Sequence, residues 1–454
     1  MKNSKDINMC EGPLLGNIIR YTVPIICTGI LQLLFNAADL VVVGRFCGSV
    51  SVAAVGATLA VIYLVVNLFI GLSTGAGVST AHAIGAGLDE DVHRIIHTAI
   101  PTAFLSGLLM TAIGLIGSRS VLELMDTPSD VIELSVSYMR IYFCGMTFSM
   151  LYNYGTAILR AAGDTRSPLI YLTIAGVVNV CLNVFFVAVC DMNVAGVALA
   201  TSISQGVSAF LVIRRLCMRE DACRLIPKKL HIYKTPLKKI LRIGLPAGIQ
   251  GSLFSLSNVM IQSSINSFGS IVMSGNAAAA NLEGFVYTSC NSFNQTAMNF
   301  TGQNLGAGKI DRIKRVHFTC LICVAVLGTV MGGAFYLLGK PLLSIYITDS
   351  AEAIKYGLIR ITYVCIPYLL CGIMDVTTGT IRGFGVSVPP MLITVLGVCG
   401  MRIGWIYTVF RMPQFHSPAS LYISYPISWG LTFLVESVCL FIIYRKRIKR
   451  MKTL

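Results

Sequence analysis

Long apolar segments alternate with short polar loops along the whole chain. Each segment is close to the roughly 20 residues that a helix needs to cross a bilayer. Backbone groups in lipid must be paired within their own segment, so runs of this length predict helices. We predict twelve spans, at residues 18–43, 52–78, 95–117, 131–157, 168–190, 195–217, 240–266, 271–300, 316–338, 357–380, 389–410 and 419–443.

Composition supports a membrane protein over a soluble one. Of the 454 residues, 55% are hydrophobic and 12% are charged, whereas soluble domains carry about 25% charged residues. This excludes a soluble enzyme with a single anchor and predicts an all-α polytopic membrane protein. Residues 1–16 are polar, without the short apolar region of a cleaved signal peptide.

Basic residues predict the orientation of the spans. The net charge is +15, but the bases lie between apolar spans, so we expect no nucleic-acid partner. The termini and the even-numbered loops hold 27 Lys and Arg, the odd-numbered loops hold five, and the spans hold three. Positive loops stay inside, so both termini are predicted to face the cytoplasm from the cell membrane. The segment Arg214–Arg242 carries ten bases; it either binds anionic lipid or, the favoured interpretation, only fixes topology and joins two halves.

The two halves repeat one another at an offset of about 222 residues. Matching positions include Pro24 with Pro246, Arg160 with Arg382, Gly163 with Gly385, and Pro168 with Pro390. Six spans separate the copies, so both run in the same direction, as in some secondary transporters.

This repeat predicts two pseudo-symmetric six-helix lobes with a cleft between them. The N-lobe is placed at residues 1–217, a basic cytoplasmic linker at 218–239, and the C-lobe at 240–454. The fifteen cysteines form no disulfide framework; Cys320 and Cys323 have CxxC spacing but no second ligand pair nearby. We therefore expect no cofactor or structural metal.

Short motifs occur in the order of a known family. They are "FNAADLVVVGRF", "AIGAGLDED", "ILRAAGDTRSP", "NVCLN" before "AGVALATSISQ", "GLPAGIQ", "GQNLGAGKIDR" and "IRGFGVSVPP". Over nearly its full length the chain resembles the multidrug and toxic compound extrusion (MATE) family. The resemblance implies an exporter of small organic, often cationic, compounds, driven by inward movement of H⁺ or Na⁺ through alternating access of two lobes.

One acid in the first span is the leading candidate for ion coupling, because acids in a membrane span are costly and mark functional sites. Counting residues from the span ends puts Asp39, Asn183 and Thr201 at one depth, with Asn179 one turn below Asn183. The family's cation site matches onto these four residues, so Asp39 is a candidate for H⁺ or Na⁺. Family members often have Asp at the position of Asn183, which puts tight Na⁺ binding in doubt. The alternative is that the amides only bridge helices.

Acids in the second half are candidates for a substrate cleft. The positions of two acids common in the family fall on Phe254 or Ser255 and on Cys371. Asp375, one turn further on, and Glu283 are predicted to face cationic substrate or relay protons. The alternative is that one of them pairs with Arg402. Glu436 is expected to pair with a terminal base.

Polar and aromatic residues extend the predicted cleft. Asn281, Thr288, Ser292, Gln295 and Asn299 share one helix face, which favours contact with water over lipid. Asn153, the repeat partner of Asp375, joins this set, and Tyr287 and Met150 offer aromatic and soft surface for cations. Tyr63, Tyr154 and Phe293 are further candidates. Pro24 and Pro246 are predicted to let their spans bend.

Two other functions agree less well with the sequence than drug export does. A flippase for lipid-linked sugars, from a related branch, is expected to line its cavity with bases, yet only Arg140, Arg360 and Arg402 lie within spans. A membrane enzyme needs a nucleophile with a base, or a metal cluster. The only histidines that lie close together in the sequence are His82, His93 and His97, and they sit on a charged turn. We therefore expect no enzyme, and we expect no obligate protein partner.

Overall fold

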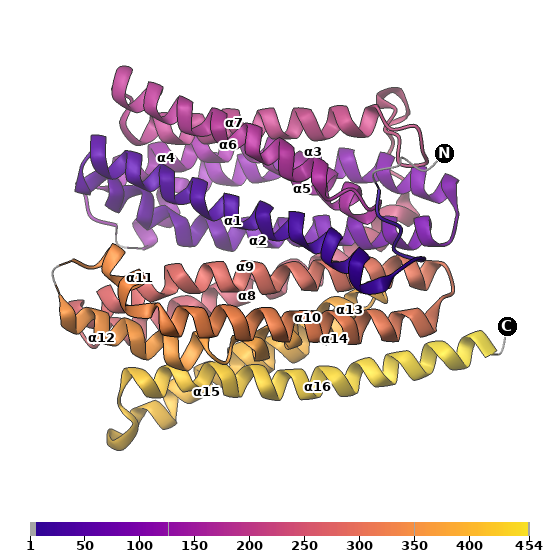
Figure 1. The fold of residues 1–454 in the computed structure, drawn as a ribbon. Helices are drawn as coiled ribbons and strands as arrows, with labels where there is room; N and C mark the ends of the chain where they lie inside the picture. Colours follow the sequence, from indigo (N-terminus) through magenta and orange to yellow (C-terminus); the bar gives the residue numbers. More distant parts are fainter. Residues whose placement is uncertain (1–5, 126, 349, 453–454) are drawn as a thin grey trace. The chain divides into compact units, whose positions relative to one another are not determined.

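The computed structural model describes residues 6–125, 127–348 and 350–452, and these residues form helices and no strand (Figure 1). The helices are α1 Leu14–Phe46, α2 Ser49–Gly85, α3 Asp89–Leu124, α4 Ile132–Cys144, α5 Met146–Ala161, α6 Arg166–Val184, α7 Asn193–Cys217, α8 Lys234–Asn266, α9 Ser270–Gly306, α10 Ile310–Leu337, α11 Gly339–Tyr346, α12 Ala351–Arg360, α13 Tyr368–Gly383, α14 Val388–Thr394, α15 Met401–Tyr407 and α16 Pro418–Lys452. Three π-helical turns, Phe185–Val189, Ile361–Cys365 and Val395–Gly400, continue α6, α12 and α14.

Every predicted span coincides with a helix or a helix pair, which confirms the all-α membrane fold. Within the described ranges, eight helices are long and apolar enough to cross a membrane. A ninth span forms when Ala351–Cys365 and Tyr368–Gly383, bent by 41°, are taken together. The remaining three predicted spans fall on α4 with α5, which Gly145 separates, and on α8 and α9. The last two carry more polar side chains, and polar spans need protein or water rather than lipid beside them.

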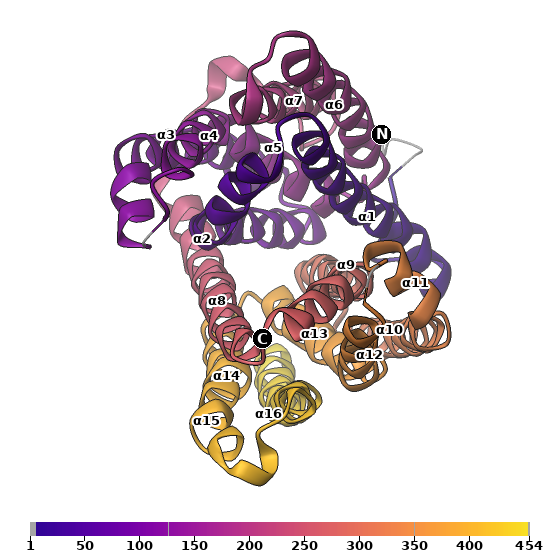
Figure 2. The ribbon, with the colours of Figure 1, turned by 90° about the vertical axis from the view of Figure 1, so that its left-hand side faces the viewer.

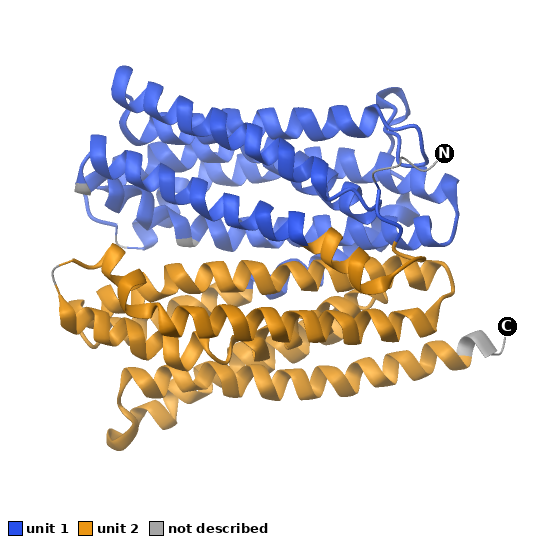
Figure 3. Cartoon of the chain, viewed as in Figure 1, with its two compact units in different colours: residues 1–8, 23–252 blue, residues 9–22, 253–454 orange. Residues whose placement is uncertain are grey.

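The chain divides into two compact units (Figure 3). Unit 1 holds residues 1–8 and 23–252, and unit 2 holds residues 9–22 and 253–454. Packing therefore assigns the first turns of α1 to unit 2 and the first half of α8 to unit 1. The boundaries of the predicted lobes come from the sequence repeat and not from packing, so the lobes stay a prediction. Residues 1–5 and 453–454 of these lobes lie outside the described part of the chain.

Each unit is a bundle whose helices pack side by side. In unit 1, α5 contacts α2, α3 and α7, and α6 contacts α7. In unit 2, α9 lies against α10, α12 and α13, and α13 also contacts α16 (Figure 2). The core of unit 1 is apolar and includes Met110, Phe143 and Leu159. This packing fixes the faces of α6, α7, α9 and α13 that carry the candidate residues.

Small residues bring α2 and the first half of α8 together inside unit 1. A Cβ added at Gly71 would overlap the backbone of Gly248, and one added at Gly75 would overlap the carbonyl of Ile240. Such close approach lets two helices in a membrane gain van der Waals contact. The α2–α8 crossing therefore depends on the absence of side chains at these positions.

The basic segment between α7 and α8 is bound to unit 1. Arg219 is only 1% exposed and pairs with Asp6 at 2.6 Å and with Asp221. The ring nitrogen Nε2 of His97 accepts a hydrogen bond from the backbone N–H of Ile226 at 3.0 Å. Among the three histidines His82, His93 and His97, His97 therefore has a structural role: it binds the backbone of the basic segment.

The glycine crossing predicts a position-specific effect of a single methyl group. Gly71→Ala should lower the melting temperature in detergent, because the added methyl collides with backbone that cannot move aside. Gly56→Ala on the same helix is the matched control, since open space surrounds a Cβ there. That control should be neutral or stabilising, because alanine is favoured over glycine in a helix by about 1 kcal/mol. Equal melting temperatures for the two variants would contradict the crossing.

Candidate functional site

Four residues predicted for ion coupling lie together in unit 1. The amide Nδ2 of Asn183 in α6 donates to Oδ1 of Asp39 in α1 at 2.5 Å. The hydroxyl of Thr201 in α7 donates to the other carboxylate oxygen at 3.5 Å. Asn179 closes the cluster, because its Oδ1 accepts from Asn183 at 3.2 Å and its Nδ2 donates to Thr201 at 3.3 Å. The cluster depends on the i,i+4 spacing of the asparagines and on the packing of α6 against α7.

The Asp39 cluster combines one carboxylate, two amides and one hydroxyl, without a basic partner in the described chain. No ion pair of Asp39 occurs among the residues that the structure describes. The side-chain oxygen of Asn183 is buried and accepts no hydrogen bond there. A buried oxygen without a partner is costly, and a small hard cation bound by oxygens would supply one. The residues therefore fit either a proton on Asp39 or a bound Na⁺.

The second half lacks an equivalent cluster. At the repeat offset, the positions of Asp39, Asn179, Asn183 and Thr201 are taken by Ile261, Met401, Trp405 and Ile423. All four are apolar and cannot bind a cation through oxygen. Within the repeat, this oxygen cluster belongs to the first half alone.

Glu283 forms a buried ion pair in unit 2 with Arg360. The guanidinium of Arg360 donates to Oε2 of Glu283 at 2.6 Å and to the amide oxygen of Asn276 at 2.5 Å. Tyr422 donates to the same Asn276 oxygen at 3.0 Å. The proposed pairing of Glu283 with Arg402 is therefore wrong, and Glu283 has a neutralised charge.

Arg402 is instead held by aromatic rings. Its guanidinium lies 3.8 Å from the ring centre of Tyr425 and 5.5 Å from that of Trp429. It donates to the hydroxyl of Ser428 at 3.1 Å. The pairing of Arg402 with Asp375 is also wrong. Asp375 accepts a hydrogen bond from Asn291 at 3.3 Å, and no ion pair of Asp375 is found in the described residues.

Glu436 departs from the prediction that it pairs with a terminal base. Its carboxylate accepts hydrogen bonds from Thr378 at 2.7 Å and from Thr394 at 3.0 Å. The side chain is 0% exposed. The sequence prediction failed because α16 turns this position toward α13 and α14 rather than toward the basic end of its own helix.

The remaining residues of the predicted cleft occupy different environments. Asn281 and Tyr287 on α9 are exposed, the latter by 47%, and Gln295 is half-buried. Asn153 is half-buried, and its amide donates to the carbonyl of Ser149. Met150 is 0% exposed and belongs to the core of unit 1, so it offers no open surface for a cation. Its placement corrects the prediction for that residue.

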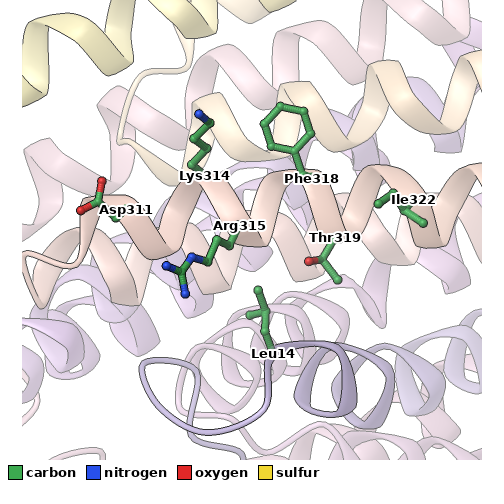
Figure 4. Close-up of a pocket in the computed structure, with 7 residues that line it drawn as sticks. All are labelled: Leu14, Asp311, Lys314, Arg315, Phe318, Thr319 and Ile322. Atoms are coloured by element: carbon green, nitrogen blue, oxygen red, sulfur yellow. The ribbon is translucent and has the colours of Figure 1, made fainter.

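A pocket in unit 2 lies apart from these candidates. It has a volume of about 630 Å³ and is lined by Leu14 of α1 and by residues of α10, namely Asp311, Lys314, Arg315, Phe318, Thr319 and Ile322 (Figure 4). Charged side chains gather at one end of this α10 segment and exposed apolar ones at the other. It shares no residue with the predicted substrate cleft.

Comparison with known proteins identifies the family. The model of the MatE family matches residues 24–185 and 246–408. The chain belongs to the MatE family. The two matched segments begin at Pro24 and at its repeat partner Pro246, which agrees with the internal repeat.

Relatives and solved structures cover nearly the whole chain. The chain is 27% identical over 426 residues to the probable multidrug resistance protein YoeA of Bacillus subtilis, covering 91% of each chain. It is 25% identical over 405 residues to the probable multidrug resistance protein NorM of Thermotoga maritima, covering 87% of this chain and 86% of that one. The outward-facing structure of a multidrug resistance MATE family transporter matches with a TM-score of 0.91 at 20% identity, covering 99% and 100%. This last match shows the fold.

Sequence reasoning missed two polar networks in unit 2. One joins Glu283, Arg360, Asn276 and Tyr422, and the other joins Glu436, Thr378 and Thr394. The sequence did show Arg360 as a base within a span, so Arg360 could have been considered beside Arg402 as a partner of Glu283. Nothing in the sequence pointed to the two threonines, because hydroxyl donors from other helices come together only in the folded bundle.

The Glu283–Arg360 pair predicts a strong effect of removing one charge. Arg360→Gln or Glu283→Gln should each cost about 3–5 kcal/mol, because the remaining charge is buried without a partner. The double variant Glu283→Gln/Arg360→Met should recover most of that loss. Chemical unfolding in detergent measures all three. The control is Arg119→Gln, whose pairs with Glu123 and Glu133 are exposed to solvent and should contribute little to stability. A buried-pair effect no larger than this control would contradict the assignment.

Proposed function

We propose that this protein exports small organic, mainly cationic, compounds from the cell by H⁺ or Na⁺ antiport. The relatives described as multidrug resistance proteins support export of such compounds. The Asp39 cluster carries the proposal for the coupling ion, since it presents an acid in a membrane span with amide and hydroxyl groups around it and no base from the described residues. The proposed location is the cell membrane with both termini in the cytoplasm, in line with the bias of the basic residues.

Coupling in this proposal follows from the charge of Asp39. A proton or Na⁺ neutralises the carboxylate, and Asn183, Asn179 and Thr201 support the bound ion through their oxygens. An ion drives transport only if it binds one conformation of the protein more tightly than the other. Two alternating lobes supply these conformations, with ion binding and substrate release favouring the same one.

Pro24 is the proposed bending point of α1. It removes a backbone hydrogen bond one turn before its own position, and it lies next to Val23, where α1 passes from unit 2 to unit 1. Thr28 donates its hydroxyl to the carbonyl of Pro24 at 2.7 Å. Pro246 has the equivalent place inside α8 and is proposed to act likewise. Asp39 lies on the same helix as Pro24, so a change of its charge can alter the bend.

The substrate region is proposed on the second half. Asp375 is an acid in a span without an ion pair in the described chain, and Tyr287 on α9 is exposed. An acid and an aromatic ring attract organic cations. The alternative, a flippase for lipid-linked sugars, requires several free bases, whereas two of the three bases within spans are engaged, Arg360 by Glu283 and Arg402 by aromatic rings.

The coupling role of Asp39 is tested by removing its charge. Asp39→Asn keeps the size of the side chain but cannot exchange a proton or hold Na⁺ strongly. Gradient-driven dye efflux from proteoliposomes should fall by about tenfold or more, while equilibrium dye binding to the purified variant is retained. Efflux under an imposed ΔpH and an imposed ΔNa⁺, measured separately, identifies the ion.

The matched control for this experiment is Asp130→Asn, which removes an exposed acid from a loop of unit 1. It should leave both efflux and binding unchanged. Wild-type efflux with asparagine at position 39 would refute the coupling role. Loss of dye binding and of folded protein together would assign Asp39 to structure instead.

The charge of Asp375 is predicted to select substrates. Asp375→Asn should reduce efflux of cationic dyes more than efflux of neutral ones, because only the cations lose an electrostatic attraction. The comparison uses matched dye pairs in the same vesicles. Asp311→Asn, which removes an exposed acid at the first turn of α10, is the control. An equal loss for both dye classes would place Asp375 outside substrate recognition.

A further inference from the structure

A fully buried carboxylate in unit 2 accepts hydrogen bonds on only one of its two oxygens. Glu436 of α16 is 0% exposed. Its Oε1 accepts from the hydroxyls of Thr378 and Thr394 at 2.7 and 3.0 Å. Its Oε2 is buried and has no hydrogen-bond partner in the described chain. Burial of an ionised carboxylate with an oxygen that accepts no hydrogen bond costs free energy relative to the same group in water.

The same face of α13 places a second acid and a base near Glu436. Asp375, Thr378 and Arg382 are spaced by three and four residues, so they lie along one side of the helix. Thr378 faces Glu436, since it donates to it. Asp375 and Arg382 each lie about one helical turn from Thr378 on this side of α13, so both charges are placed to act on Glu436 and on each other. The cluster thus contains two acids and one base.

The other buried charged groups on the helices that pack against α16 are engaged elsewhere. Arg360 of α12 pairs with Glu283, and Arg402 of α15 bonds to Ser428, two turns of α16 before Glu436. Helix α14, which supplies Thr394, contains no titratable side chain. On α16 itself, the thiol of Cys439 is the nearest titratable group. The charge balance at Glu436 therefore rests on Asp375 and Arg382.

One proton neutralises this cluster. With both acids ionised, Arg382 leaves one negative charge uncompensated in a buried place, which is unfavourable. Adding a proton to the Glu436 carboxylate forms the neutral acid, breaks no bond in the protein, and gives Oε2 a hydrogen to donate. Losing that proton restores the anion and the charge attraction to Arg382. The cluster thus has two states that differ by a single proton.

We propose that Glu436 is a second proton-binding site, in unit 2, linked electrostatically through Arg382 to Asp375. Arg382 lies in the last turn of α13 and is half-buried. Charge bias assigns this end of the spans to the cytoplasm, so the site exchanges its proton with that side. The site is separate from Asp39, and its protonation is measured without transport. Its test therefore stands whether or not Asp39 couples export to an ion.

Infrared difference spectroscopy of the purified protein, recorded between acidic and alkaline buffer, tests the proposal. Wild-type protein should show a carbonyl band of a protonated, buried carboxyl that disappears as pH rises. Glu436→Gln should remove this band and about one proton of uptake per molecule. The amide keeps an oxygen that accepts from Thr378 and Thr394, so the variant is expected to fold.

Controls separate this band from those of other acids. Glu352→Gln, which removes an exposed acid in the first turn of α12, should leave the spectrum unchanged. Asp39→Asn removes any band of the Asp39 carboxyl itself, so a band that persists in this variant and is lost in Glu436→Gln belongs to Glu436. A spectrum in which Glu436→Gln equals the wild type would overturn the proposal. So would a permanently ionised carboxylate at position 436, because that would make it a fixed counter-charge of Arg382.

A second variant covers the case in which Glu436→Gln does not give folded, monodisperse protein. Thr378→Val keeps the shape of the side chain and the Glu436 carboxyl but removes one hydrogen-bond donor. The carboxyl band should then persist at a different frequency, because a hydrogen bond to its oxygen is lost. A band with the wild-type frequency would show that it does not arise from Glu436, and this also overturns the proposal.

Discussion

The cost of placing charge in hydrocarbon governs where the polar groups of this protein lie. A lone charge in a span costs several kcal/mol, so each one must gain a partner or serve a function. The chain meets this constraint in three ways. Asp39 is surrounded by two amides and a hydroxyl, Glu283 is neutralised by Arg360, and Arg402 is covered by Tyr425 and Trp429. Of these three arrangements, only the first contains a carboxylate without a basic partner in the described chain.

Helix packing makes these arrangements possible. The Asp39 cluster requires α1, α6 and α7 to meet at one level, and the packing of α6 on α7 holds Asn179 near Thr201. In the same unit, glycines let α2 and α8 approach until their backbones touch. Such close contacts resist small adjustments. Any movement during transport is therefore expected at bends such as Pro24 rather than within these contacts.

The two halves share a repeat but differ in their buried chemistry. At the repeat offset, the oxygen ligands of the first half are replaced by apolar side chains in the second. The second half has its own polar networks, around Glu283 and around Glu436, which the first half lacks at the matching positions Val61 and Arg214. A common scaffold thus supports different sites, as expected when function depends on side chains rather than on the fold.

The sequence by itself determined the helical membrane fold, the repeat and the common depth of Asp39, Asn183 and Thr201. These follow from local rules: apolar length sets a span, and residue counts along a rigid helix set depth. The grouping of the Asp39 residues into one site was implied by the family resemblance, and their contacts were decided by helix packing. The partners of Glu283, Arg402 and Glu436 were decided only by the tertiary structure. Depth along a helix leaves its rotation open, and rotation decides which neighbour a side chain meets. For that reason Glu436 turned toward Thr378 and Thr394, and Met150 turned into the core.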